Sequence, residues 1–275
     1  MNRKDFSIDG SFLEHRGRKV FYLLLEPVGG GVRDSILFLP AFAEEMNKSR
    51  HIVASQARAL AAAGYRVMLL DVTGCGDAGG EFADATWQCW VEDALLAADT
   101  LAAMGAGSLS LWGLRLGAPL ACEVSRSRAD IRRLVLWQPV LNGEQQIDQF
   151  LRLKAMSSAV NGSVSFDRKT LWNELRAGRP LEVAGYDLSS ALALELAKVR
   201  LNDLKPGCEQ VDWVEVGTLS GDSFSVAAES VVSNWQQQGV SVGKHSVPGD
   251  PFWRIVDAGI NASLQRCTSE VFAQS

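Results

Sequence analysis

Short apolar runs alternate with longer segments of helical spacing along most of the chain, and this pattern constrains the fold most. The apolar runs cover residues 35–39, 65–70, 108–112, 134–137, 211–216 and 240–247. Helical spacing covers 51–63, 86–104, 226–238 and, after a tight turn at 113–117, the stretch up to about 126. Short runs without polar positions are typical of strands buried on both faces. Their alternation with helices predicts an α/β fold with a mainly parallel, doubly wound sheet.

Two parts of the chain depart from this alternation. Residues 6–15 and 18–26 alternate apolar and polar side chains around Arg16 and Gly17, which predicts an N-terminal antiparallel hairpin. From 140 to 206 the pattern lapses into helical segments. We therefore expect a core made of residues 1–139 and 207–275, with a helical cap insertion at 140–206.

Composition excludes several classes of partner. The 27 Lys and Arg residues against 32 Asp and Glu residues leave no basic footprint for nucleic acid. The polar first ten residues and the lack of a long apolar stretch argue against a signal peptide or a transmembrane segment, so we expect a cytoplasmic protein. Five cysteines without C-x-x-C spacing indicate neither a disulfide framework nor a zinc site. The glycine loops do not form a dinucleotide motif, and we expect no cofactor and no metal.

The most informative strand end lies at residues 111–117, because ligands of an open parallel sheet bind at the carboxyl ends of its strands. The segment Leu-Trp-Gly-Leu-Arg-Leu-Gly is typical of a strand, a G-x-X-x-G turn and a helix. It resembles the nucleophile elbow of the α/β-hydrolases. That superfamily carries Ser, Cys or Asp at the centre of the turn, whereas this chain has Arg115.

The resemblance to α/β-hydrolases covers nearly the whole chain, from the hairpin through an oxyanion loop at 40–47 and a glycine-rich loop at 71–80 to the C-terminal strands. Segments 42–50, 113–117 and 249–253 also resemble the exosortase A system-associated hydrolase 2 proteins. Members of that branch accompany bacterial exopolysaccharide and protein-sorting loci. The resemblance implies an α/β-hydrolase fold and an esterase-like acyl hydrolase in cytoplasmic support of those systems, with the hydrolase label resting on fold alone.

The same resemblance implies a Ser-His-Asp triad, two members of which are missing. Asp222 stands roughly where the acid of the superfamily follows a late strand. Pro251 occupies the last strand-to-helix loop, where the histidine is expected, and His245 lies earlier, within the strand itself. Without a hydroxyl at the elbow and a histidine opposite it, the usual proton relay cannot operate.

Arg115 admits two interpretations. A guanidinium at a helix N-terminus suits a carboxylate or phosphate, which predicts an anionic ligand. Because a buried guanidinium must be paired, the other interpretation is an internal salt bridge to Glu44, Glu45 or Asp250. The two interpretations are not exclusive.

The loop after the first buried strand carries the other candidates. Glu44 and Glu45 are candidate bases that activate a water, and the N–H groups of Leu116 and of Phe42 or Ala43 form the expected oxyanion nest. The remaining expected pocket residues are Asn47, Cys75 and Asp250. A purely structural interpretation makes Asn47 or Ser49 a helix cap, with the acids in the first turn.

Cys75 offers a different nucleophile if His51 lies within reach of its thiol. A serine hydrolase that uses Ser220 or Ser223 is a weaker option. The two main hypotheses are a hydrolase acting on a small-molecule or acyl substrate, and a non-catalytic pseudoenzyme that binds an anionic ligand or a protein partner. The sequence leaves the oligomeric state open, with a homodimer among the options.

Overall fold

The computed structural model describes residues 5–105, 107–160, 167–217 and 224–274. Within them, eight strands form one sheet in the order β1-β2-β4-β3-β5-β6-β9-β10. The strands are β1 (Phe6–His15), β2 (Arg18–Pro27), β3 (Ser35–Leu39), β4 (Arg66–Asp71), β5 (Leu109–Leu114), β6 (Ile131–Trp137), β9 (Gln210–Gly217) and β10 (Ser241–Pro248). From β4 to β10 every neighbouring pair is parallel, while β1 and β2 form the expected antiparallel hairpin and β2 runs antiparallel to β4. This is the mainly parallel α/β sheet that the alternation predicted, in the arrangement of the α/β-hydrolase fold that the resemblance implied.

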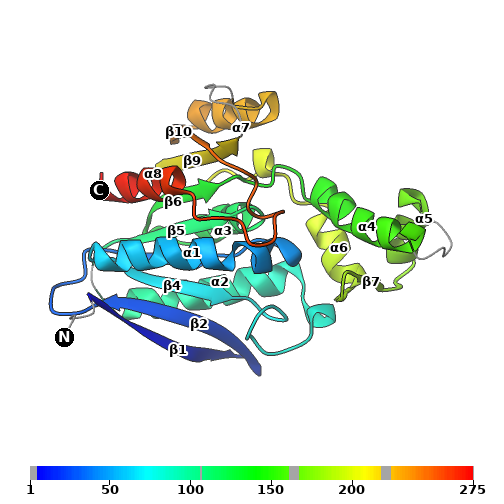
Figure 1. The fold of residues 1–275 in the computed structure, drawn as a ribbon, viewed down its shortest axis with the longest axis horizontal. Helices are drawn as coiled ribbons and strands as arrows, with labels where there is room; N and C mark the ends of the chain where they lie inside the picture. The colour runs from blue at the N-terminus through cyan, green and yellow to red at the C-terminus, as the bar shows by residue number, and fades with distance from the viewer. Residues whose placement is uncertain (1–4, 106, 161–166, 218–223, 275) are drawn as a thin grey trace.

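Helices cover both faces of the sheet. The helices around the sheet are α1 (Glu44–Ala62), α2 (Trp87–Ala103), α3 (Gly117–Arg126), α7 (Val226–Gln237) and α8 (Ala262–Ala273), with a short 3-10 turn η1 (Phe82–Asp84) before α2. In Figure 1, α1 and α8 lie in front of the sheet, and α2 and α3 lie behind it. Side chains of α7 share the apolar core that contains those of α2 and α3. The sheet is therefore enclosed on both sides, as its apolar strands require.

Strand alternation divides the interior into two apolar cores. Leu111 on β5 and Leu134 on β6 pack toward α2 and α3, whereas Trp112 and Val135, one residue later, pack toward α1 and α8. All four side chains are fully buried. Successive strand residues point to opposite faces, so a central strand must be apolar at every position.

Between β6 and β9 the chain leaves the sheet. This segment contains α4 (Gly143–Val160), α5 (Arg168–Arg176), β7 (Leu181–Val183), β8 (Tyr186–Leu188), α6 (Ser190–Leu196) and the 3-10 turn η2 (Leu201–Asp203). Helices α4, α5 and α6 lie beyond the edge where the carboxyl ends of the parallel strands meet (Figure 1), whereas η2 lies against α7. The small β7–β8 hairpin was not anticipated within a helical segment. The division of the chain into a core and a cap stays a prediction.

Two helices differ from the sequence-based expectation. Helix α1 begins at Glu44 rather than at 51, because the residues of its first turn are mostly polar and show no apolar periodicity. Its cap is Ala43, which makes no side-chain hydrogen bond, so a cap at Asn47 or Ser49 is wrong. Helix α8 was not anticipated, although its Asn261 cap accepts a hydrogen bond from the Leu264 N–H.

The described residues can be compared with the expectations for membrane-spanning helices, metal sites and disulfides. No helix among them combines the length and the apolarity needed to cross a bilayer. No group of three His, Cys, Asp or Glu side chains in the same part of the chain is arranged to hold a metal ion. The cysteines are free thiols, and all but Cys267 are buried.

Candidate functional site

The backbone of the elbow is formed although the nucleophile is absent. Arg115 has a φ of 54°, and its N–H donates to the Trp137 carbonyl at 2.9 Å. A Cβ on Gly113 would lie 2.4 Å from the Gly117 carbonyl oxygen, and one on Gly117 would lie 2.1 Å from that of Leu39. Only glycine therefore permits this close approach of α3 to β3 and β5. The frame predicted from the G-x-X-x-G spacing is confirmed.

The Arg115 side chain forms an internal ion pair. Its Nη2 lies 3.0 Å from Glu45 Oε1, and its Nε lies 3.2 Å from both carboxylate oxygens of Glu45. The other donors reach Gln146 Oε1 at 3.2 Å and the Gln138 carbonyl at 3.3 Å. The guanidinium also stands 5.3 Å from the ring centroid of Trp253. Most of its hydrogen-bonding capacity is therefore taken by the protein itself.

The pairing resolves which acid partners Arg115. Glu45 is the partner, whereas Glu44 lies 4.0 Å from Lys48 in a partly exposed pair. Asp250 lies in a separate hollow bounded by residues 248–263. The Arg115 side chain is 9% exposed and that of Glu45 14%, so both charges have lost most of their water. Removing one partner would leave the other charge unpaired in a poorly solvated site.

Three non-glycine residues with positive φ gather at the carboxyl ends of neighbouring strands. They are Ala43 after β3, Arg115 after β5 and Gln138 after β6, with φ of 49°, 54° and 42°. Gln138 holds the next strand as well, because its Oε1 accepts the Val216 N–H at 2.8 Å. Such backbone strain is concentrated at functional sites. Sequence reasoning missed Gln138, since nothing in a glutamine after a strand signals a left-handed conformation.

The three backbone donors of the expected nest follow β3 and the elbow residue. Among the described residues, the N–H groups of Phe42, Ala43 and Leu116 have no hydrogen-bond acceptor. All three residues are buried, with at most 3% of their surface exposed. Free N–H groups at a strand end and a helix start favour a negative charge.

An aromatic cluster fills the space next to this nest. The Phe42 ring lies 5.0 Å from that of Phe150, 5.7 Å from Phe82 and 6.1 Å from Trp90. Tyr186 extends the cluster, and its hydroxyl accepts the Asn47 Nδ2–H at 2.8 Å. Burial, reinforced by the nearby Glu44 carboxylate, raises the pKa of Tyr186 to about 12. The phenol is therefore neutral at physiological pH, and Asn47 anchors it rather than capping α1.

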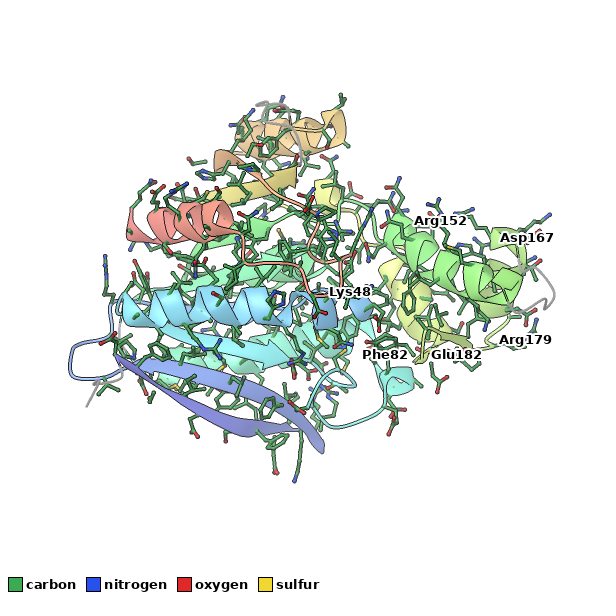
Figure 2. The ribbon with its side chains drawn as sticks, in the orientation of Figure 1. Lys48, Phe82, Arg152, Asp167, Arg179 and Glu182 are labelled. Carbon is green, nitrogen blue, oxygen red and sulfur yellow. The ribbon has the colours of Figure 1, made fainter. Side chains whose placement is uncertain are left out.

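A cleft of about 570 Å³ opens above the Arg115–Glu45 pair. It is lined from α1 by Glu44, Glu45 and Lys48, from the oxyanion loop by Phe42, from the loop after β10 by Trp253 and Arg254, and from α4 by Gln146, Gln149, Phe150, Arg152, Leu153 and Met156. Figure 2 shows Lys48 at the start of α1 and Arg152 on the facing helix α4. The sequence did not single out the α4 residues, because their role depends on how α4 docks.

The histidines do not face the elbow residue. His245 Nε2 lies 2.9 Å from Asp212 Oδ1, and Arg133 Nε lies 3.4 Å from Asp212 Oδ2. This group lies on the face of β6, β9 and β10 that α8 covers, as the bond from Arg133 to the Val271 carbonyl shows. The hydrogen bond to Asp212, helped by Cys267, raises the pKa of His245 to about 9. His245 is therefore a charged structural group.

The proposed Cys75–His51 pair is not formed. Burial raises the pKa of the Cys75 thiol to about 12, with the Asp71 carboxylate adding to the effect. His51 is exposed, and its Nε2 contacts the Ala258 carbonyl. Cys75 is therefore a protonated thiol without a histidine base.

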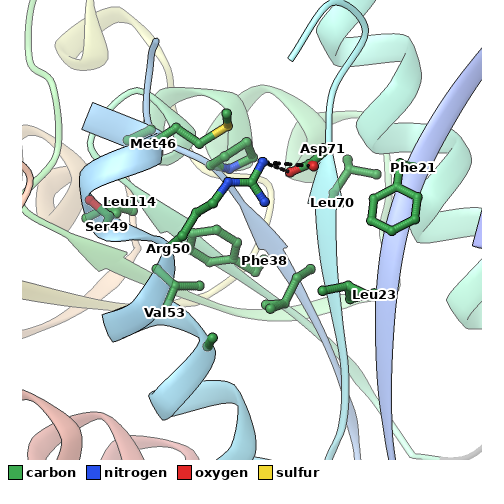
Figure 3. A pocket seen from close by; sticks show the side chains of 14 residues that line it. Phe21, Leu23, Phe38, Met46, Ser49, Arg50, Val53, Leu70, Asp71 and Leu114 are labelled. Atoms are coloured by element: carbon green, nitrogen blue, oxygen red, sulfur yellow. Dashed lines mark hydrogen bonds and ion pairs between the residues drawn. The ribbon is translucent and has the colours of Figure 1, made fainter. Parts of the chain in front are cut away.

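Asp71 closes the glycine-rich loop with an ion pair of its own. Arg50 extends from α1 to the Asp71 carboxylate, with Nη2–O distances of 3.1 and 2.9 Å (Figure 3). Asp71 Oδ2 also accepts the Asp77 N–H at 3.0 Å. An apolar cavity of about 190 Å³ lies beside this pair, with Phe38, Val53 and Leu114 among its walls.

Some expected residues are not placed. Asp222, Ser220 and Ser223 belong to 218–223, outside the described residues. Pro251 is partly buried in the loop after β10, where its carbonyl accepts the Arg254 N–H at 2.8 Å. That loop brings Trp253, rather than an imidazole, to the Arg115 side chain.

Solved structures share this fold at low sequence identity. Est1E from Butyrivibrio proteoclasticus, in a structure with ferulic acid bound, has a TM-score of 0.68 at 15% identity and covers 96% of this chain and 98% of its own. A proline iminopeptidase-related protein from Thermus thermophilus has 0.62 at 17%, covering 97% and 98%. Alpha/beta hydrolase domain-containing protein 10 from mouse has 0.61 at 14%, covering 97% and 99%. A sequence comparison with curated proteins found no match.

A comparison with protein-family models finds a family that matches this sequence. The family described as serine aminopeptidase, S33, matches residues 31–177, which is more than half of the chain. The matched part runs from just before β3 through the elbow to the end of α5. The chain therefore belongs to the serine aminopeptidase S33 family of the α/β-hydrolase superfamily.

Proposed function

We propose that this protein is a non-catalytic member of its family that binds a small-molecule ligand in the cleft between α1, α4 and the loop after β10. The observation that carries the proposal is the buried Arg115–Glu45 pair at the elbow. A covalent acyl transfer needs a nucleophile with a base beside it. Here the central position holds a cation that is already neutralised.

Glu45, His245 and Cys75, three of the candidates for base or nucleophile, are each unavailable for such chemistry. Both Glu45 oxygens accept hydrogen bonds from Arg115, so the carboxylate is already engaged by the guanidinium. His245 is held by Asp212 under α8, and the Cys75 thiol is protonated. A binding role needs only the cleft, which has the size of known ligand pockets.

The domain division and the biological setting belong to the same proposal. We infer a core of residues 1–139 and 207–275 and a cap at 140–206, because α4 of that segment forms one wall of the cleft. The resemblance of three segments to exosortase-associated proteins supports a role near exopolysaccharide or surface-protein export in the cytoplasm. The ferulic acid bound to Est1E supports a small organic ligand for this fold.

Ester hydrolysis is the competing function, and the free backbone donors favour it. The N–H groups of Phe42 and Leu116 remain available to stabilise an oxyanion. Glu44, whose side chain is 34% exposed, would be the base that activates a water. Glu45 is the less favoured candidate because both of its oxygens bind Arg115.

A fluorophosphonate probe and p-nitrophenyl esters and thioesters of graded acyl length test the proposal. We expect no labelled serine and no turnover above buffer for the wild type. Folded variants Arg115→Ala and Glu44→Gln, checked by circular dichroism, separate the two functions. Turnover that Glu44→Gln abolishes while the fold is intact would establish the hydrolase and overturn the binding role. A single labelled serine would do the same.

A further inference from the structure

The rim of the cleft carries more positive charge than its acidic residues neutralise. Lys48 pairs with Glu44 at 4.0 Å, and the charge of Glu45 is matched by Arg115. Arg254 reaches only a neutral amide, because its Nη2 lies 3.3 Å from Gln149 Oε1. Arg152 has no hydrogen-bond or ion-pair partner among the described residues. Two guanidinium groups therefore face the cleft without a carboxylate from that part of the chain.

An apolar wall stands beside these arginines. Phe150 is buried in the wall, while Leu153 and Met156, also on α4, are 39% and 67% exposed. The spacing of 150, 153 and 156 places one side chain on nearly every turn of the same helix face. Exposed apolar side chains that line a concave surface mark a binding site more often than scattered surface residues do.

We propose that the cleft binds a single-chain amphipathic anion, with a phosphate or carboxylate head at Arg152 and Arg254 and an apolar chain along Phe150, Leu153 and Met156. This proposal rests on the ligand-binding function above and names its ligand class. Guanidinium groups bind phosphate and carboxylate oxygens through paired hydrogen bonds. The volume of about 570 Å³ lies within the range of pockets for ligands of this size.

This assignment moves anion recognition away from Arg115. Glu45, Gln146 and the Gln138 carbonyl take the donors of Arg115, so a ligand anion would have to displace a buried carboxylate there. At the rim, Arg152 and Arg254 are exposed and gain a partner without breaking an ion pair. The head group therefore binds at the mouth of the cleft.

Titration calorimetry with monomeric dodecyl phosphate, at concentrations below micelle formation, tests the proposal. We expect saturable binding that weakens at least tenfold in Arg152→Ala/Arg254→Ala. The variant Arg58→Ala, an exposed arginine of α1 outside the cleft, is the matched control and should bind as the wild type does. Leu153→Asp, at an exposed position, should weaken dodecyl phosphate but not change the unfolding temperature.

The other probes identify which part of the ligand matters. Dodecanoate should bind in the same arginine-dependent way, whereas inorganic phosphate and neutral dodecanol should bind far more weakly. Equal affinity for inorganic phosphate or for dodecanol, or unchanged binding by the double variant, would overturn the assignment. Binding to anionic vesicles without binding of monomeric dodecyl phosphate would overturn the assignment and show that this face contacts a membrane surface. Ester turnover is measured separately. Its detection would overturn the non-catalytic role, whereas arginine-dependent binding would still support the ligand class.

Discussion

Arg115 Nη2 and Glu45 Oε1 lie 3.0 Å apart, at the point where β5 turns into α3 and α1 begins. The pair joins two strand ends that in a serine hydrolase present the nucleophile and the oxyanion donors. The elbow backbone keeps its left-handed residue and its close glycine contacts. The chain has thus retained the strained turn and given its central side chain a structural partner.

Breaking this pair on one side should destabilise the protein strongly. We expect Arg115→Met or Glu45→Gln to lower the free energy of unfolding by roughly 3 to 5 kcal/mol, because each leaves a buried group without its partner. The double variant Arg115→Met/Glu45→Gln should lose less than the sum of the single losses. Urea unfolding of the four proteins gives the coupling energy.

Glu44→Gln is the control for this cycle, since its partly exposed pair with Lys48 should contribute at most about 1 kcal/mol. If the losses in free energy of unfolding for Arg115→Met and Glu45→Gln simply add in the double variant, the two residues are not coupled.

Restoring a hydroxyl at the elbow should not restore a serine hydrolase. We expect Arg115→Ser to react with fluorophosphonate no faster than the wild type, because an elbow serine needs an imidazole to take its proton. His245 lies under α8, His51 contacts the Ala258 carbonyl, and His15 ends β1 of the hairpin. Mass spectrometry of the labelled peptides is the measurement. Rapid labelling at position 115 would reveal a base that this geometry does not provide.

Stability should fall as the medium becomes alkaline. The hydrogen bond to Asp212 raises the pKa of His245 to about 9, above its ordinary value of about 6.5. A raised pKa means that the imidazolium stabilises the fold fully below about pH 6.5 and that this contribution is lost as the pH rises through about 9. The loss is on the order of 2 kcal/mol, given the partial exposure of the ring.

Thermal unfolding of the wild type and of His245→Gln between about pH 6 and pH 10 measures this contribution. The variant should be less stable at the acidic end and should lose much of the pH dependence. A wild-type unfolding temperature that rises across the window would contradict the assignment of charge to His245.

The cysteines should differ sharply in reactivity. Cys75 is 6% exposed and its pKa is raised to about 12, so almost no thiolate is available at about pH 8. Cys267 is partly exposed on α8 and should be alkylated first by iodoacetamide in the native protein. Peptide mapping with and without urea is the measurement. Fast alkylation of native Cys75 would revive the thiol nucleophile.

Gly76 should tolerate no side chain. A Cβ there would lie 2.0 Å from Asp71 Oδ2 and 2.2 Å from Arg50 Nη2, at a φ of 59°. We expect Gly76→Ala to lower the free energy of unfolding by about 3 kcal/mol or more, through backbone strain and loss of the Arg50–Asp71 contact. Gly29→Ala has a comparable φ of 84° with nothing within 4 Å, so it should lose only about 1 kcal/mol. Equal losses for the two variants would show that the ion pair does not fill the space.

The fold could be predicted from the sequence because its signals are local. Apolar runs such as Ile36 to Leu39 mark strands buried on both faces, and Arg16 with Gly17 marks the hairpin turn between β1 and β2. The elbow could be found because Gly113 and Gly117 are required by close backbone contacts. The start of α1 could not, since Ala43 caps it through backbone geometry without a characteristic side chain.

By itself the sequence determined the parallel sheet, the elbow and the replacement of its nucleophile by Arg115, because periodicity and glycine spacing depend on neighbouring residues. It offered three acids or a ligand anion as the partner of Arg115 without choosing among them. Only the tertiary structure chose Glu45, brought Gln138 and Gln146 to the guanidinium, and placed His245 under α8. These contacts join residues far apart in the chain, and their distances depend on how α1, α4 and the loop after β10 pack together.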